Sequence, residues 1–151
     1  MSFKQKNTIV TLVNFSLILM FYLLRMAQFI QNNNFTDDKV FRLWGIIIVL
    51  AVFVTIAATI LTHIVSAIIE HARTGEAKPD LENFEDERDK FIDLKGTQVT
   101  YTASSIGVFL AMLTFVFGQP PLIMFSLLIF FGVLAQIIGD VTRLSLYKRG
   151  L

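Results

Sequence analysis

Four long apolar stretches alternate with short polar segments along the 151 residues of the chain. The second stretch is the clearest of the four, because no charged residue occurs between Trp44 and Ile69. A helix needs about 20 apolar residues, each with a rise of about 1.5 Å, to cross a bilayer. The pattern therefore predicts four membrane-spanning helices, with approximate bounds at residues 9–30, 43–69, 97–117 and 122–147.

The predicted fold class is all-α, an integral membrane four-helix bundle in which residues 1–151 form a single domain. A hydrophilic segment joins spans two and three, and residues 80–95 are expected to form an amphipathic cytoplasmic helix. Two arrangements stay open: this helix lies along the membrane surface, or it runs directly into span three, with Gly96 as the expected bend. Its apolar residues recur near helical spacing: Phe84, Phe91 and Leu94.

Small residues in the predicted spans allow neighbouring helices to approach one another closely. We therefore expect close helix contacts within the bundle, and a homo-oligomer in the lipid bilayer. The small residues in question are Ala57, Ala58, Gly107, Ala111, Gly132 and Gly139.

The distribution of basic residues predicts the orientation of the chain. Nine Lys and Arg residues lie in the two terminal tails and the loop between spans two and three, against two in the first loop. We therefore expect a multi-pass protein with both termini and the hydrophilic segment in the cytoplasm. The nine are Lys4, Lys6, Arg73, Lys78, Arg88, Lys90, Lys95, Lys148 and Arg149, and the two are Lys39 and Arg42.

The composition supports a membrane protein and disfavours several other classes. Hydrophobic residues make up 54% of the chain, above the roughly 45–50% of soluble proteins. The net charge of +1 argues neither for nor against a nucleic-acid partner. No large basic patch occurs, so we expect no such partner. The absence of cysteine excludes disulfides and thiolate catalysis.

The sequence contains no Gly-rich phosphate loop, no His-Glu-x-x-His motif and no nucleophile elbow. We therefore predict a non-enzymatic protein without a cofactor. A metal site built from His63, Glu70 and His71 is disfavoured, because His71 lies near the membrane surface and two His without Cys are a weak ligand set. No metal is predicted.

Polar residues inside the spans are the first candidates for function, since each needs a partner in lipid. They predict an intramembrane polar cluster of His63, Glu70, Asp140, Arg143 and Arg25. Two interpretations stay open: these side chains hold helices together, or His63 and a carboxylate carry protons. Asp140 and Arg143 have the spacing of a local ion pair. The polar stripe of span two contains Thr55, Thr59, Thr62, His63, Ser66 and Glu70.

The hydrophilic segment between Glu70 and Gly96 carries nine acids and five bases. It is a solvated surface helix, a docking surface for a cytoplasmic or membrane protein, or a gate that leads into span three. An anionic leaflet attracts basic segments rather than acidic ones, which favours contact with a protein. Our leading hypothesis is therefore an interaction or regulatory protein that acts through this helix. The alternative is a small oligomeric ion channel or proton-coupled transporter that uses the polar stripe of span two.

The residues Asp86-Glu87-Arg88-Asp89, followed by Phe91-Ile92, Lys95 and Tyr101, precede two spans that close on Leu146-Tyr147-Lys148-Arg149-Gly150. This C-terminal half resembles a family of small prokaryotic four-span membrane proteins, a domain of unknown function. The resemblance implies a prokaryotic inner membrane and no particular reaction. It points to an interaction or ion-pair network at the start of span three, formed by Asp86, Glu87, Arg88, Asp89 and Lys95.

Overall fold

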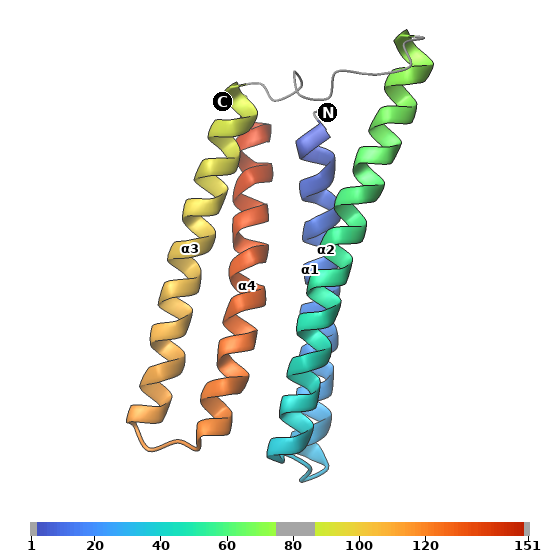
Figure 1. The fold of residues 1–151 in the computed structure, drawn as a ribbon. Coiled ribbons are helices and arrows are strands. Elements are labelled where there is room, and N and C mark those ends of the chain that lie inside the picture. The colour runs from blue at the N-terminus through green and yellow to red at the C-terminus, as the bar shows by residue number, and fades with distance from the viewer. Residues whose placement is uncertain (1–2, 75–86, 150–151) are drawn as a thin grey trace.

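The computed structural model describes residues 3–74 and 87–149, and these residues form four α-helices (Figure 1). All four helices are long and apolar enough to cross a membrane. The described part of the chain contains no strand, so the predicted all-α class is confirmed. The helices are α1 (Phe3–Gln31), α2 (Asp37–Thr74), α3 (Glu87–Val116) and α4 (Pro121–Lys148).

Local sequence explains where the two tight turns lie. Asn33, in the turn between α1 and α2, has a φ of 49°, a left-handed conformation that asparagine tolerates better than most residues. Two acidic residues, Asp37 and Asp38, lie in the first turn of α2, where their negative charges interact favourably with the positive end of the helix dipole. Gly118 supplies a φ of 81° between α3 and α4, and Pro121 opens α4.

Helix α4 is the centre of the molecule, because it packs against α3 on one side and against α1 on the other. Helix α2 packs mainly on α1, and it has little contact with α3. Both described chain ends lie at the same end of the molecule as the beginning of α3 (Figure 1). The order in space is therefore α3, α4, α1, α2, an open arrangement of two helical hairpins.

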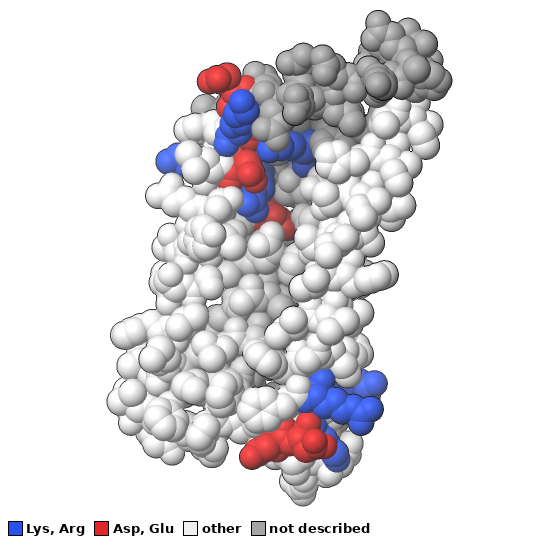
Figure 2. Space-filling model, in the orientation of Figure 1, with Lys and Arg blue, Asp and Glu red and all other residues white. Residues whose placement is uncertain are grey.

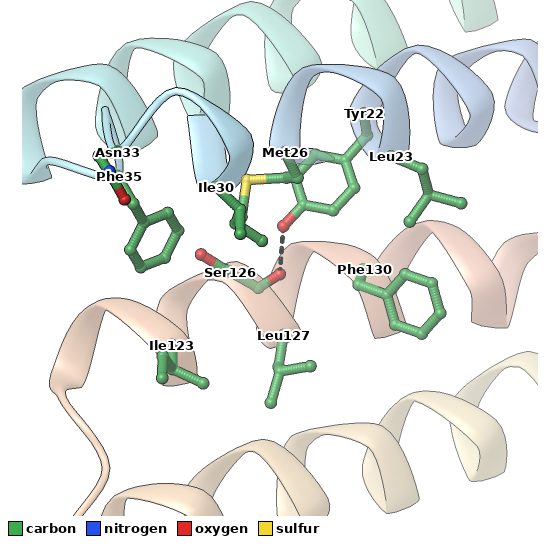
Figure 3. A pocket seen from close by; sticks show the side chains of 10 residues that line it. All are labelled: Tyr22, Leu23, Met26, Ile30, Asn33, Phe35, Ile123, Ser126, Leu127 and Phe130. Atoms are coloured by element: carbon green, nitrogen blue, oxygen red, sulfur yellow. Dashed lines mark hydrogen bonds between the residues drawn. The ribbon is translucent and has the colours of Figure 1, made fainter. Parts of the chain in front are cut away.

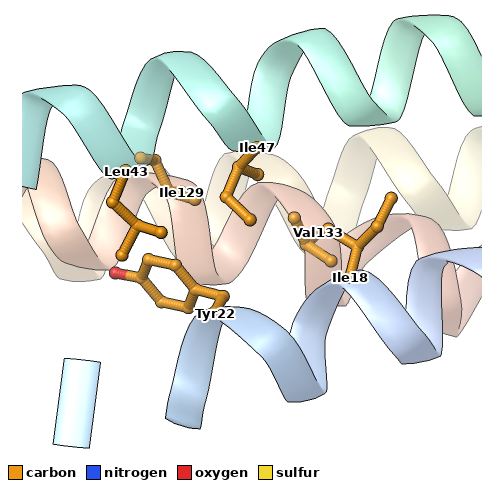
Figure 4. Close-up of a cluster of buried hydrophobic side chains, with 6 residues drawn as sticks. All are labelled: Ile18, Tyr22, Leu43, Ile47, Ile129 and Val133. Atoms are coloured by element: carbon orange, nitrogen blue, oxygen red, sulfur yellow. The ribbon is translucent and has the colours of Figure 1, made fainter. Parts of the chain in front are cut away.

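An apolar core joins α1, α2 and α4 near the turn between α1 and α2 (Figure 4). The Tyr22 side chain reaches across this core, and its hydroxyl donates a hydrogen bond of 2.7 Å to the Ser126 carbonyl oxygen. The phenol thus satisfies its polar group inside an otherwise apolar cluster. The cluster consists of Ile18, Tyr22, Leu43, Ile47, Ile129 and Val133.

Helix α2 differs along its length. Its 38 residues extend about 57 Å at the rise of an α-helix, well beyond a hydrocarbon core of about 30 Å. Among the side chains of α2 that the structure describes, the buried apolar ones are Val40, Leu43 and Ile47, which lie in the first three turns. Farther along, Val49 and Phe53 are 67% and 69% exposed. The far end of α2 stands clear of the other helices in Figure 1.

Helix α3 is continuous through Gly96, so residues 87–95 run directly into span three, which was one of the two arrangements left open, and residues 80–86 lie outside the described part. Gly96 is buried, and a β-carbon there would collide with the Arg143 side chain of α4. The residue permits a close approach between helices rather than a change of direction. Gly107 likewise permits a close approach to Phe131, and Gly139 permits a close approach to Thr100.

The other small residues behave differently. Ala111 is fully buried, as expected for a contact residue, whereas a β-carbon at Gly132 would meet no atom within 4 Å. Gly132 therefore makes no close contact with another helix within the described chain. Ala57 is half-buried on α2, and the side chain of Ala58 lies outside what the structure describes.

Candidate functional site

Polar side chains of α3 and α4 meet where α3 begins and α4 ends. On α3 they recur every fourth residue and so share one helical face: Asp89, Asp93 and Thr97. On α4 they are spaced by three or four residues: Asp140, Arg143 and Tyr147. We call these six residues the α3–α4 polar network.

Arg143 is the hub of the network. Its Nε donates to Asp93 Oδ1 at 3.0 Å and one terminal nitrogen donates to Asp140 Oδ1 at 2.9 Å. The other terminal nitrogen donates to the Thr97 hydroxyl at 2.8 Å. The Arg143 side chain is only 13% exposed. One guanidinium thus links two carboxylates on different helices, and its planar fork suits this geometry.

Asp140 is the most deeply buried charged residue of the described chain, at 2% exposure. Its Oδ1 accepts hydrogen bonds from Arg143 and, at 3.2 Å, from the Gln136 amide. Thr11 of α1 also faces this carboxyl group. The second oxygen, Oδ2, is buried and has no hydrogen-bond partner in the described structure. A carboxylate in this position depends strongly on Arg143 for stabilisation.

A second connection lies one turn farther toward the chain ends. The Tyr147 hydroxyl donates a hydrogen bond of 2.9 Å to Asp89 Oδ1, and Arg88 donates one of 3.3 Å to the Tyr147 carbonyl oxygen. Asp89 is only 6% exposed although it is an acid at a helix end. Because the Tyr147 hydroxyl donates to a carboxylate, this hydrogen bond is stronger than one between two neutral groups.

The motif that carries the family resemblance is thus divided between two faces of α3. Asp89 points toward α4, whereas Glu87 is exposed. Lys95 is also exposed, and its ammonium lies 5.8 Å from the centroid of the Phe91 ring. Asp86 lies outside the described residues. Within the described part, the motif therefore contributes one buried acid, one arginine that contacts α4, and two outward charges.

The predicted intramembrane polar cluster is only partly assembled. The local pair of Asp140 and Arg143 is present. Arg25 lies on the exposed face of α1, where it donates to the Gln28 amide at 3.3 Å and stacks over Phe21. His63 is exposed on α2, and the Glu70 side chain lies outside what is described. The structure does not bring Arg25 or His63 to the Asp140 carboxyl group.

The described hydroxyl groups of the polar stripe on α2 donate hydrogen bonds to the backbone of their own helix. Thr55 donates to the Ala51 carbonyl oxygen at 2.6 Å, and Thr59 donates to the Thr55 carbonyl oxygen at 2.9 Å. Such bonds to the preceding turn satisfy a hydroxyl without a second helix. This agrees with a structural interpretation of these two threonines.

The bonds that join Asp93, Thr97 and Tyr147 to side chains of the neighbouring helix were not predicted from the sequence. A signal for them existed. Gly118 marks the turn of an antiparallel hairpin, and residues equally far from a hairpin turn face one another. Asp93 and Arg143 are equidistant from Gly118 along the chain, and so are Asp89 and Tyr147.

An open groove of about 790 Å³ lies between α1, the first turn and the start of α4 (Figure 3). Its walls are mostly apolar, and its tyrosine hydroxyl is already bonded to Ser126. Among the described residues, no group of three or more His, Asp or Glu side chains could hold a metal ion. The groove is lined by Tyr22, Leu23, Met26, Ile30, Asn33, Phe35, Ile123, Ser126, Leu127 and Phe130.

A comparison with protein-family models finds no match to this chain. Comparisons with curated proteins and with solved structures also find no match. The resemblance of the C-terminal half to a family of four-span membrane proteins therefore stays a prediction.

Proposed function

We propose that the chain is a non-enzymatic membrane protein that binds a protein partner through the outward face of α3. The observation that carries the proposal is the division of this helix into two faces. Asp89 and Asp93 bond to α4, whereas Phe91, Leu94 and Tyr101 are 48%, 66% and 71% exposed on the other side. The outward face is apolar at its centre, and Glu87, Lys90 and Lys95 flank it with exposed charges.

The charge pattern supports a position in the membrane. On the face drawn in Figure 2, the charged side chains gather at the two ends of the helices, and the band between them is free of described charges. The beginning of α1, the end of α4 and the beginning of α3 share one end of the molecule (Figure 1). The excess of basic residues in the segments at this end favours a cytoplasmic location. The outward face of α3 then begins in the cytoplasm.

The polar groups of the described structure support a role without catalysis. The buried acids Asp89 and Asp140 bond to side chains of α4. The groove between α1 and α4 is lined mostly by apolar side chains. An interaction protein needs an exposed face on a rigid element, and the polar network fixes α3 to α4 in this way.

The test is photo-crosslinking in intact membranes, with a photoreactive amino acid in place of Leu94. The matched control replaces Leu24 on α1, which is 57% exposed on a face that we assign to lipid. The proposal predicts discrete protein adducts from the Leu94 position and only lipid adducts from the Leu24 position. Equal patterns from both positions would contradict it.

A second candidate, an ion or proton conduit, draws support from one observation, the buried Oδ2 of Asp140 without a partner in the described structure. The exposure of His63 and the locally bonded Thr55 and Thr59 weigh against a path along α2. The test is flux through liposomes that contain purified protein. A conduit predicts flux that Asp140→Asn abolishes and that His63→Ala leaves unchanged, whereas no flux from the folded protein rules it out.

A further inference from the structure

The outward face of α3 carries a regular seam of exposed side chains. Successive members are separated by four and three residues in alternation, which is the heptad spacing of helices that pair in parallel. Their exposure is high: Leu94 is 66% exposed, Tyr101 71% and Met112 55%. We call this set the α3 seam: Leu94, Gln98, Tyr101, Ser105, Val108 and Met112.

Gln98 is the unusual member of the seam. Its side chain is exposed, and its amide makes no hydrogen bond to the residues that the structure describes. Threonines on exposed helix faces behave differently, since Thr102 donates to the Gln98 carbonyl oxygen at 2.9 Å and Thr55 bonds to its own helix. An amide without a partner on an exposed face of an apolar helix favours association with another helix.

We propose that the α3 seam binds the α3 seam of a second copy of this chain. The proposal rests on the proposed function, because it assigns a partner to the same face of α3. Two copies inserted in one membrane have the same orientation, so a symmetric pair is parallel and each seam residue meets its own counterpart. A glutamine amide both donates and accepts, and so it pairs with itself.

The remainder of the seam is compatible with self-pairing. No charged residue occurs between Gly96 and Val116, so like charges do not oppose each other within this part of the pair. Ser105 is small and allows close approach at the middle of the seam, while Tyr101 and Met112 provide large side chains on either side. A period of 3.5 residues gives a shallow left-handed crossing of the two helices.

The natural chain contains no cysteine, so single cysteines report this contact without background. The variants Ser105→Cys, Val108→Cys and Met112→Cys are oxidised in native membranes and the disulfide-linked dimer is quantified. The controls Ile106→Cys and Leu110→Cys lie on α3 outside the seam, at 55% and 44% exposure. We expect strong dimer bands from the three seam positions and several-fold weaker bands from both controls.

The variant Gln98→Leu tests the amide itself, because its side chain has no described contact that folding needs. We expect it to weaken dimerisation roughly tenfold in a fluorescence energy-transfer titration in liposomes, whereas Gln98→Asn retains part of the affinity. Equal disulfide yields at seam and control positions would overturn the proposal, and so would unchanged affinity in Gln98→Leu.

The photo-crosslinking result separates this inference from the proposed function. An adduct at Leu94 with twice the mass of the chain, together with disulfides along the seam, supports both. An adduct of different mass without seam disulfides keeps the proposed function and overturns the second copy as partner. No protein adduct and no seam disulfide would overturn both.

Discussion

The two helical hairpins of this protein are held together by different means. The first hairpin, α1 with α2, is joined by apolar side chains such as Ile18, Leu43 and Ile47. The second, α3 with α4, combines glycine-mediated contact with hydrogen bonds that reach from one helix to the other. Apolar contacts in lipid are only weakly specific, because lipid tails are as apolar as leucine. Polar bonds and close glycine contacts instead fix one register and one rotation of α3.

The fixed rotation determines which side chains of α3 are exposed. It turns Asp89 and Asp93 toward α4 and leaves Glu87 and the opposite face of α3 exposed. The contrast between the hairpins therefore predicts that equivalent substitutions have unequal effects, large in α3–α4 and small elsewhere.

The largest effect is expected for Arg143→Met. The variant removes the cation shared by Asp93 and Asp140 and leaves the Asp140 carboxylate buried without its ion partner. Breaking a buried ion pair in this way lowers the free energy of unfolding by about 3–5 kcal/mol. Unfolding in mild detergent, followed by circular dichroism, measures the loss. The control Arg25→Met removes an exposed arginine of α1, and a comparable loss there would contradict the special role of Arg143.

An intermediate effect is expected for Gly139→Ala. The new methyl group would collide with the Thr100 hydroxyl and approach the Gly96 carbonyl oxygen. Overpacking of this kind lowers the free energy of unfolding by about 1–3 kcal/mol. The matched control Gly132→Ala meets open space on the same helix, and alanine's higher helix propensity gives it a gain of up to about 1 kcal/mol. Changes of the same sign in the free energy of unfolding of both variants would contradict a close helix contact at Gly139.

A smaller effect is expected for Tyr147→Phe, which keeps the ring and removes the hydroxyl that donates to Asp89. The loss of a hydrogen bond to a charged group lowers the free energy of unfolding by about 1.5 kcal/mol. The control Tyr101→Phe removes a hydroxyl on the exposed seam and leaves the monomer's stability unchanged. Denaturant titration of both variants in detergent, at a dilution where the chain is monomeric, checks the difference.

The sequence predicts the four helices well, because charge-free stretches such as Trp44 to Ile69 have few other uses than crossing lipid. It also predicts the pairing of Asp140 with Arg143, since both belong to one helix and their spacing fixes their contact. The orientation of α3 is harder, because it depends on contacts with another helix. Gly96 illustrates the difficulty. A glycine before a span suggests a bend in the chain, and only the closeness of the Arg143 side chain shows that this glycine is a packing site.

The candidate site was predicted only in part for the same reason. The dense run of charged residues drew attention to the start of α3. Which of these residues face α4 and which are exposed depends on the position of α4, and the sequence of α3 alone does not give it. His63 is an example of a residue that the sequence placed in a cluster and the structure does not. Its position in a polar stripe suggested a buried cluster, whereas its side chain is exposed on α2. A stripe on one helix indicates a shared face, and it does not tell which molecule that face meets.

The most direct test of the account compares two neighbouring acids of the same motif, Asp89→Ala and Glu87→Ala. Both acids lie in the first turn of α3, so both lose the same favourable interaction with the helix dipole. The account predicts that Asp89→Ala lowers the free energy of unfolding by roughly 1.5–3 kcal/mol more than Glu87→Ala, because only Asp89 bonds to Tyr147. Equal losses of stability in the two variants would contradict the division of α3 into an inward structural face and an outward binding face.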